Sequence, residues 1–381
     1  MKSYLSSVSG IGRINKPPRA GTNKLVPRCG QIVKSSFRPH PLLPSAHLQT
    51  IATLLRPAPK IALRRERLEL TDGDFLDLGW SGDNNEGGPL AILVHGLAGG
   101  FESKYLRGTA NLLVARGWRT VIFQLRGAGP EPNRLHRCYN QDDTEDLRYF
   151  WHFLRGREPL GFIASVGWSL GGNVTLKALA EEGQKAPINI AAAASVPFNI
   201  RPCAERLSAG FSRIYQKQLL DSVKDALRRK HPRIPLSPLV NLPAALAAHD
   251  FIEFDQAYTA PLAGYSKVDD YYTHASCGQF LKNIRRTTLV VHALDDPFMT
   301  ARIVPAVEAL SSHVTLEIAP CGGHVGFVSA GALGQPYCWL ERRLAGYLHD
   351  GFKSQISGNG RALPAARIGT KPNKRKPIEL F

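Results

Sequence analysis

Residues 162–172 have the sequence FIASVGWSLGG, and this stretch decides the fold. Its first part, Phe162–Trp168, is a short apolar run typical of a buried strand, and it leads directly into the helical spacing of Leu170–Ala180. Small residues two positions before and two positions after Ser169 let the backbone turn sharply, which lifts the serine hydroxyl clear of the sheet. The stretch therefore predicts a strand-turn-helix unit with an exposed serine at its tip.

Strands and helices alternate along most of the chain around this unit. Further strands are expected at Leu90–Val94, Thr120–Leu125, Ile188–Ser195, Thr287–Ala293 and Val314–Ile318, and helices at Tyr105–Arg116 and Thr144–Leu154. Strands that are apolar throughout and alternate with helices are typical of a mostly parallel sheet with helices on both faces. The predicted fold class is therefore α/β.

The segment from about residue 201 to residue 283 interrupts this alternation. It contains an amphipathic helix, Ile214–Arg229, followed by a proline-rich part and an aromatic-rich part. The simplest interpretation of such a long insertion between two strands is a helical cap over one end of the sheet. The alternative, an ordinary peripheral subdomain, differs only in whether the segment shapes a pocket.

A serine hydroxyl is a weak nucleophile unless a base takes its proton and an acid orients that base. Downstream of Ser169, the strand Thr287–Ala293 leads into Asp295 and Asp296, and His324 follows the last expected strand in a glycine-rich loop. The order serine, acid, histidine is that of α/β-hydrolases, so the sequence predicts a triad of Ser169, Asp296 and His324. Asp295 is the alternative acid. The proline and apolar residue that follow favour Asp296 as the histidine's partner and Asp295 as a cap of the turn.

Acyl transfer also needs donors for the negative charge that develops on the carbonyl oxygen. The first helical turn after Ser169 offers the backbone N–H of Leu170. A second donor is expected from the loop His95–Gly100, where Gly96 permits the bend and the N–H of Leu97 turns inward. His95 itself is interpreted as structural. The sequence therefore predicts Leu97 and Leu170 as an oxyanion hole.

Further motifs lie well outside the serine turn. They are Phe37–Pro39, His47–Thr50, Asp72–Leu78, His95–Gly100, Gly210–Tyr215, Phe254-Asp255 and Tyr271-Tyr272. Together they resemble the YheT-like α/β-hydrolases, also called the alpha/beta-hydrolase 4 group, over about residues 37–350. The resemblance implies an α/β-hydrolase fold and a serine hydrolase of the carboxylesterase or lipase type. One departure is Cys138–Thr144, CYNQDDT, where the family often has Tyr-His-Ser-Gly-Glu-Thr.

The net charge of +17 is concentrated at the two ends of the chain. Residues 1–40 contribute +8 and residues 353–381 contribute +6, so that +3 remains for residues 41–352. We expect two basic, disordered tails at 1–36 and 353–381 around an α/β-hydrolase domain at 37–352. Nucleic-acid binding by the nearly neutral body is disfavoured. The tails are interpreted as solubilising extensions, with contact to an anionic surface or a transit peptide as alternatives.

The sequence as a whole predicts a serine esterase that forms an acyl-enzyme on Ser169. Its substrate is expected to be a small-molecule ester or an acyl lipid, and the triad chemistry requires no metal or organic cofactor. A thioesterase or acyltransferase with the same triad, or a non-catalytic binding protein on the same fold, are the alternatives. Six cysteines without a CxxC pair, and the lack of a secretory signal or long apolar run, favour a cytoplasmic location.

Overall fold

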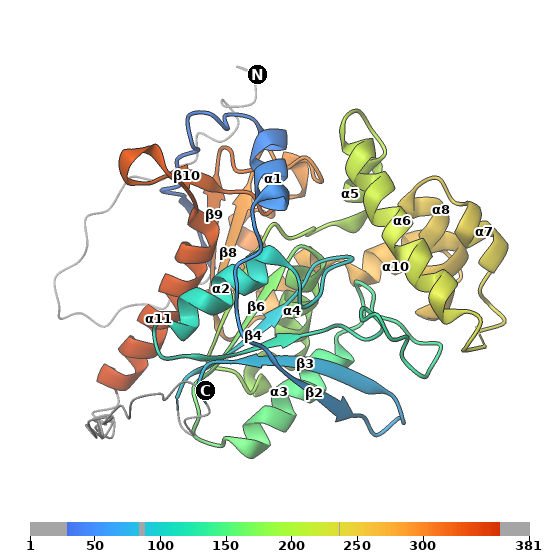
Figure 1. The fold of residues 1–381 in the computed structure, drawn as a ribbon, viewed down its shortest axis with the longest axis horizontal. Helices are drawn as coiled ribbons and strands as arrows, with labels where there is room; N and C mark the ends of the chain where they lie inside the picture. Colours follow the sequence, from blue (N-terminus) through green and yellow to red (C-terminus); the bar gives the residue numbers. More distant parts are fainter. Residues whose placement is uncertain (1–28, 84–87, 236, 359–381) are drawn as a thin grey trace, which may run out of the picture.

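A central nine-stranded sheet organises the molecule, and the computed structural model describes residues 29–83, 88–235 and 237–358 (Figure 1). The strand order is β1-β9-β8-β7-β6-β4-β5-β3-β2. The strands are β1 (Gln31–Lys34), β2 (Arg64–Glu69), β3 (Phe75–Ser81), β4 (Leu90–Val94), β5 (Arg119–Phe123), β6 (Ile163–Trp168), β7 (Ile190–Ala194), β8 (Thr287–Ala293) and β9 (Val314–Ala319). Neighbours pair in parallel, except that β3 runs antiparallel to both β2 and β5. The predicted mostly parallel α/β sheet is confirmed.

Each face of the sheet is buried under helices. Side chains of successive strand residues point to opposite faces, so Ile92 belongs to one apolar cluster and Leu93 to another. The first cluster contains residues of α3 (Glu145–Arg157) and α4 (Leu170–Glu182), and the second contains residues of α2 (Lys104–Val114) and α11 (Trp339–Gly358). Burial on both sides explains why the inner strands are apolar at most of their positions.

A helical segment fills the chain between β7 and β8, and we call this segment, Ile200–Asn283, the cap. Its helices are α5 (Ile200–Leu207), α6 (Ser212–Lys230), α7 (Leu242–Ala247), α8 (Phe251–Phe254), α9 (Ala260–Leu262) and α10 (Val268–Ala275), with a π-helical turn at Asp255–Thr259 and a 3-10 turn at Cys277–Asn283. Figure 1 shows these helices grouped together to one side of the sheet. They share an apolar core of their own, which includes Tyr215, Leu220 and Tyr272. Nowhere in the described ranges is a helix both long and apolar enough to span a bilayer.

The amino-terminal strand corrects one prediction. Residues 31–34 form β1, which pairs in parallel with β9 at the sheet edge, although they fall within the tail expected at 1–36. At the other end, α11 continues to Gly358, beyond the tail boundary expected at 353. Most side chains of β1 are exposed, so its sequence has no apolar run from which a strand could be predicted. Backbone pairing with β9, rather than apolar burial, holds this strand in place. The rest of both expected tails, 1–28 and 359–381, lies outside the described residues.

Other elements were not expected from the sequence. Among them are helices α1 (Ala46–Leu55) and α11 and a small antiparallel pair, β10 (Val328–Ala330) with β11 (Pro336–Cys338). The buried carboxylate of Glu317 on β9 accepts hydrogen bonds from Ser35, which directly follows β1, and from Arg343 on α11, both at 2.8 Å. These two bonds connect the amino-terminal segment to β9 and α11. The amino-terminal segment is therefore an integral part of the fold.

We expect a chain that begins at Phe37 to be less stable than a chain that begins at Cys29. Removing residues 29–36 takes away β1 and leaves buried Glu317 without the Ser35 donor, which lowers the free energy of unfolding by about 1–3 kcal/mol. Urea denaturation of the two truncated proteins measures the difference. Equal stabilities would contradict a structural role for β1.

Candidate active site

Ser169 lies at the turn between β6 and α4, and its backbone is strained. Its φ of 52° and ψ of −122° are values that residues other than glycine rarely adopt. Two close approaches enforce this turn: a Cβ atom on Gly167 would lie 2.1 Å from the carbonyl oxygen of Gly171, and one on Gly171 would lie 2.3 Å from that of His95. The two glycines are therefore required by the backbone contacts around the serine, as the sequence pattern predicts.

The structure brings together the three side chains that the sequence predicts as a triad. His324 Nε2 lies 3.1 Å from Ser169 Oγ, and His324 Nδ1 lies 2.8 Å from Asp296 Oδ2. The second oxygen of Asp296 accepts the backbone N–H of Phe298 at 2.8 Å. Asp295, the alternative acid, instead accepts the N–H of Gly323 at 3.0 Å. The two neighbouring aspartates therefore differ in role: one contacts the imidazole ring and the other holds the loop that carries it.

Phe298, which entered the sequence argument only as the apolar residue after Pro297, contacts the predicted triad. Its ring stacks on the imidazole of His324, with centroids 3.9 Å apart and planes inclined by 8°. Tyr215 of the cap packs in turn against Phe298, with ring centroids 5.1 Å apart. The stack fixes the plane of the imidazole and links it to the cap.

Helix α1 clamps the loop that carries His324. The hydroxyl of Thr50 accepts the backbone N–H of His324 at 2.9 Å, and the side chain of Gln49 accepts the N–H of Val328 at 2.6 Å. Both α1 side chains are buried. The approach is close enough that a Cβ atom on Gly323 would collide with the backbone of α1. The motif His47–Thr50, noted in the sequence only as part of a resemblance, thus has a physical role in positioning the histidine.

The loop after β4 lies against Ser169. A Cβ atom on Gly96 would be 3.2 Å from that of Ser169, and the residues on either side of Leu97 are fixed by hydrogen bonds to Tyr105 and Tyr139. Among the residues that the structure describes, no acceptor pairs with the backbone N–H of Leu97 or of Leu170. These two groups, predicted as an oxyanion hole, are thus available beside the serine.

His95 has a structural role, as expected. Its Nε2 accepts the backbone N–H of Leu125 at 3.0 Å, so its Nδ1 carries the proton and lies 2.7 Å from the carbonyl oxygen of Gly96. Burial lowers the pKa of His95 to about 4, which keeps the ring neutral. Its two hydrogen bonds fix the start of the loop that presents Leu97.

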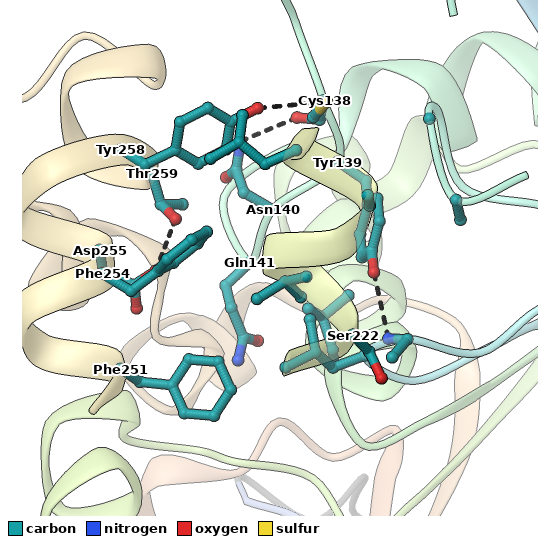
Figure 2. A pocket seen from close by; sticks show the side chains of 18 of the residues that line it. Cys138, Tyr139, Asn140, Gln141, Ser222, Phe251, Phe254, Asp255, Tyr258 and Thr259 are labelled. Atoms are coloured by element: carbon teal, nitrogen blue, oxygen red, sulfur yellow. Dashed lines mark hydrogen bonds between the residues drawn. The ribbon is translucent and has the colours of Figure 1, made fainter. Parts of the chain in front are cut away.

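A cavity of about 420 Å³ lies between the cap and the loops that follow β4 and β5 (Figure 2). Leu97 and Leu170 line it on the side of the sheet. Most of the opposite wall consists of apolar and aromatic cap side chains, among them Ile200, Leu207, Phe251, Phe254, Tyr258 and Tyr272. The lining residues Ser222 and Arg229 on α6 are exposed, so the cavity opens along that helix. Its size and mostly apolar wall suit a small organic ligand.

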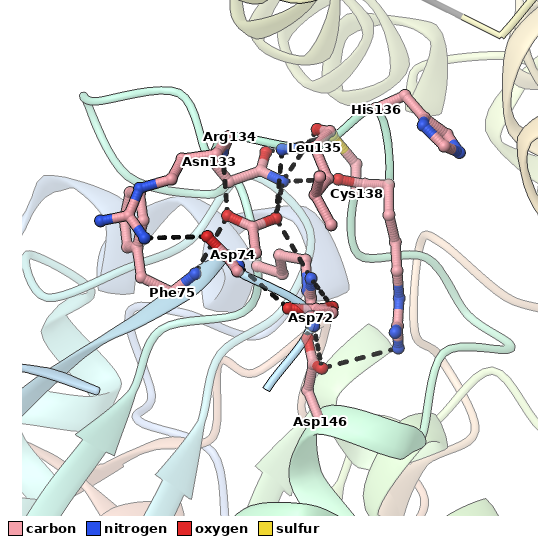
Figure 3. Close-up of polar contacts among 12 residues, drawn as sticks. Asp72, Asp74, Phe75, Asn133, Arg134, Leu135, His136, Cys138 and Asp146 are labelled. Atoms are coloured by element: carbon pink, nitrogen blue, oxygen red, sulfur yellow. Dashed lines mark hydrogen bonds and ion pairs between the residues drawn. The ribbon is translucent and has the colours of Figure 1, made fainter. Parts of the chain in front are cut away.

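A buried ionic network fixes the loop that forms one side of this cavity (Figure 3). Arg126, only 3% exposed, donates to both oxygens of Asp146 (2.8 and 2.6 Å), to Asp72 (2.6 Å) and to Asp74 (3.1 Å). Burial opposes the positive charge, but Asp146 and Asp72 raise the pKa of Arg126 above its usual value. Burial alone would raise the pKa of Asp74. Hydrogen bonds from the Asn133 side chain and from the loop backbone outweigh burial and hold this pKa below its usual value.

The same network reaches the cap through Lys230. This buried lysine at the end of α6 donates to Asn133 Oδ1 (2.8 Å) and to the carbonyl oxygen of Arg137 (2.9 Å), and it contacts Cys138 Sγ (2.9 Å). Because Asn133 also donates to Asp74, one chain of contacts joins the hairpin β2–β3, the loop after β5 and the cap. Local sequence patterns do not reveal this network, since its members are far apart in the chain.

Known proteins resemble this chain in sequence and in fold. Residues 89–330 match the family model described as alpha/beta hydrolase fold. The chain is 38% identical over 307 residues to "Putative esterase YheT" of Escherichia coli (strain K12), over 80% of this chain and 90% of that protein. It is 30% identical to "Phospholipase ABHD3" of Mus musculus, over 72% of this chain and 70% of that protein. The solved Pyrococcus furiosus esterase Pf2001 has a TM-score of 0.51 at 15% identity, over 77% of this chain and 91% of that chain, which concerns the fold alone.

We expect the substitution Arg126→Met to lower the free energy of unfolding by about 3–5 kcal/mol, because it leaves the buried carboxylate of Asp74 without its cation and removes the bidentate partner of Asp146. Arg134→Met is the matched control: Arg134 pairs with Glu69 on the surface, so its loss leaves stability unchanged within error. Urea denaturation measures both variants. An equal effect of the two substitutions would refute a stabilising role for the buried network.

Proposed function

This chain belongs to the YheT-like group of the alpha/beta hydrolase fold family, and on that premise we propose that it cleaves carboxylic esters through an acyl-enzyme on Ser169. Its relatives carry the names of an esterase, a phospholipase and a monoacylglycerol lipase. The observation that carries the proposal is the continuous hydrogen-bonded chain from Ser169 through His324 to Asp296 at a strand-to-helix turn.

In the first half of the reaction, Ser169 Oγ attacks the acyl carbon of the ester while His324 Nε2 accepts the serine proton. The carbonyl oxygen gains a negative charge, which the N–H groups of Leu97 and Leu170 and the amino-terminal end of α4 stabilise. The protonated histidine then gives its proton to the departing alcohol oxygen. The bond between the acyl carbon and that oxygen breaks, and the acyl group remains on Ser169.

In the second half, His324 takes a proton from a water molecule, whose oxygen attacks the acyl carbon of the serine ester. The bond to Ser169 Oγ breaks, the serine regains its proton from the histidine, and a carboxylic acid leaves. Asp296 accepts the proton on Nδ1 of His324 in a hydrogen bond throughout, which selects the tautomer that leaves Nε2 free as a base. Its carboxylate also stabilises the imidazolium that forms in both halves.

The substrate class that this site favours is a small-molecule ester or an acyl lipid. The mostly apolar cavity beside Leu97 and Leu170 has the size of a pocket for one small ligand or one acyl chain. The wall also contains polar side chains, of which Ser222, Asp225 and Arg229 on α6 are exposed. A cytoplasmic location, expected from the cysteine usage, stays a prediction.

A fluorophosphonate probe tests the proposal directly, because it labels a serine only when a base activates the hydroxyl. We expect the wild-type protein to be labelled and to cleave p-nitrophenyl esters. Ser169→Ala and His324→Ala should both lose labelling and lower kcat by about a million-fold, to background. A folded wild-type protein that is neither labelled nor active would overturn the proposal.

The two neighbouring aspartates give a second, sharper prediction. Asp296→Asn keeps the shape of the side chain but no longer stabilises the imidazolium or fixes its tautomer, so kcat falls by about 10⁴-fold. Asp295→Asn retains an oxygen that can accept the Gly323 N–H, so the change stays within about tenfold. Steady-state kinetics on one ester compares the pair. A larger loss in Asp295→Asn would reverse the assignment of the triad acid.

A further inference from the structure

We propose that Cys138 and Lys230 are the site of an oxidative modification, a reversible sulfur–nitrogen crosslink between the loop after β5 and the end of α6. The observation that carries the proposal is a contact of 2.9 Å between Cys138 Sγ and Lys230 Nζ. Neither side chain takes part in the chemistry proposed for Ser169. The inference is therefore independent of the proposed function, and its test measures a mass rather than the cleavage of an ester.

The ammonium group of Lys230 is buried, and no described carboxylate pairs with it. Only 3% of the lysine is exposed. Its other contacts are three neutral oxygens, which belong to the side chain of Asn133 (2.8 Å) and to the backbone of His136 (3.0 Å) and Arg137 (2.9 Å). The thiol of Cys138 is thus its one contact that can carry a negative charge, and the thiolate is the form of cysteine that oxidants attack.

This contact distinguishes Cys138 from the other cysteines of the chain. Within residues 29–83, 88–235 and 237–358, no other sulfur lies at hydrogen-bond distance from a lysine amine. Cys338 contacts Arg56 instead, and a guanidinium group keeps its proton and is no nucleophile. Cys203 and Cys277 are buried. An oxidative crosslink to an amine is therefore expected at Cys138.

A small oxidant can reach the sulfur of Cys138 through the cavity. The residue is partly exposed and lines the cavity together with Lys230 and Tyr258. Figure 2 shows Cys138 at the edge of the cavity, where the hydroxyl of Tyr258 lies 3.6 Å from its sulfur. The cavity opens to solvent along α6, where Ser222 and Arg229 are exposed. A molecule of the size of hydrogen peroxide can enter by this opening.

The modification consumes one molecule of hydrogen peroxide, which is the oxidant. In the first step the thiolate of Cys138 attacks one peroxide oxygen and the O–O bond breaks. The sulfur gives two electrons to the peroxide and becomes a sulfenic acid. The hydroxide that leaves takes a proton from the Lys230 ammonium, which yields water and a neutral amine.

In the second step the amine nitrogen of Lys230 attacks the sulfur of the sulfenic acid. A sulfur–nitrogen bond forms and the bond between the sulfur and its oxygen breaks. The hydroxide that leaves combines with one proton of the amine to give a second water molecule. The product is a sulfenamide, the class of compound that a sulfenic acid gives with a nitrogen nucleophile.

The observed geometry favours this second step. Reacting atoms held about 3–3.5 Å apart are at the distance from which such an attack begins, and the sulfur and the nitrogen are already in contact at 2.9 Å. The neutral amine keeps two N–H groups for Asn133 and Arg137, and its lone pair is left for the sulfur. Because the amine is part of the same molecule, its attack competes well with a thiol from solution.

The crosslink would join residues that are 92 positions apart in the sequence. Like a disulfide, it restricts the conformations of the unfolded chain and so stabilises the folded protein. It also fixes the end of α6 to the loop after β5, both of which contribute to the cavity wall. Oxidation of Cys138 to a sulfinic acid without a crosslink would bring no such gain in stability.

Peptide mass spectrometry tests the crosslink directly. The protein is treated with hydrogen peroxide, its free thiols are alkylated, and it is digested with trypsin without reduction. We expect residues 138–148 joined to residues 230–233, because a modified Lys230 is no longer a cleavage site. The joined peptide weighs about 2 Da less than the sum of its parts, and dithiothreitol returns both peptides to their reduced mass.

Substitutions and thermal unfolding provide the controls. Cys138→Ser removes the sulfur, and Lys230→Arg keeps the positive charge but removes the amine, so neither variant should give the joined peptide. Cys321→Ser removes another partly exposed cysteine and should give it in the same yield as the wild type. Peroxide should raise Tm by about 5–10 °C in the wild type and in Cys321→Ser, and in neither of the other two variants.

The outcomes decide the inference without reference to esterase activity. A joined peptide that retains one oxygen between sulfur and nitrogen has undergone one further oxidation by peroxide and also supports the crosslink. Cys138 recovered only as a free thiol, a sulfinic acid or a disulfide overturns the inference, as does a joined peptide that persists in Lys230→Arg. The wild-type digest gives this answer even where a variant does not fold.

Discussion

The close backbone contact around Ser169 is the constraint on which the rest of the site depends. The backbones of Gly167 and Gly171 lie so close together that no side chain fits between them, and the carbonyl oxygen of His95 leaves no room for a side chain on Gly171. These contacts hold Ser169 at a positive φ, which an isolated turn would not keep. The sheet has to supply that rigidity, and β6 can do so because it is buried between β4 and β7 with helices on both faces.

The loops that meet Ser169 come from distant parts of the chain, and each is held by its own buried polar contact. The histidine loop is clamped by α1, the loop after β4 by His95, and the loop after β5 by the network around Arg126. Hydrogen bonds and ion pairs, rather than apolar packing, hold these loops because they fix the orientation of the bonded groups as well as the distance between them. The cap joins the same system through Lys230 and through the packing of Tyr215 against Phe298.

The sequence predicted the parts of this arrangement that depend on local pattern. The apolar runs at β4, β6 and β8, the glycines around Ser169, and the order of serine, acid and histidine each have a local physical cause. Asp295 and Asp296 stayed unresolved because adjacent side chains at a strand end point in different directions, which only the folded loop defines. Strand β1 and the Arg126 network escaped prediction because their partners lie far along the chain, and exposed strand residues or isolated charges have no periodic signal.

Two backbone N–H groups without a described acceptor lie in the turns around Ser169, and their position bears on what the site can do. The buried charged side chains of Arg126, Asp74 and Lys230 nearby all have hydrogen-bond partners. The N–H groups of Leu97 and Leu170 remain unengaged within the described residues, and both residues line the same cavity. Stability alone would favour pairing or removing them. Their retention in one cavity, beside a strained serine, is what a binding site for a polar, reacting molecule requires, because the ligand completes the hydrogen bonds that the protein leaves open.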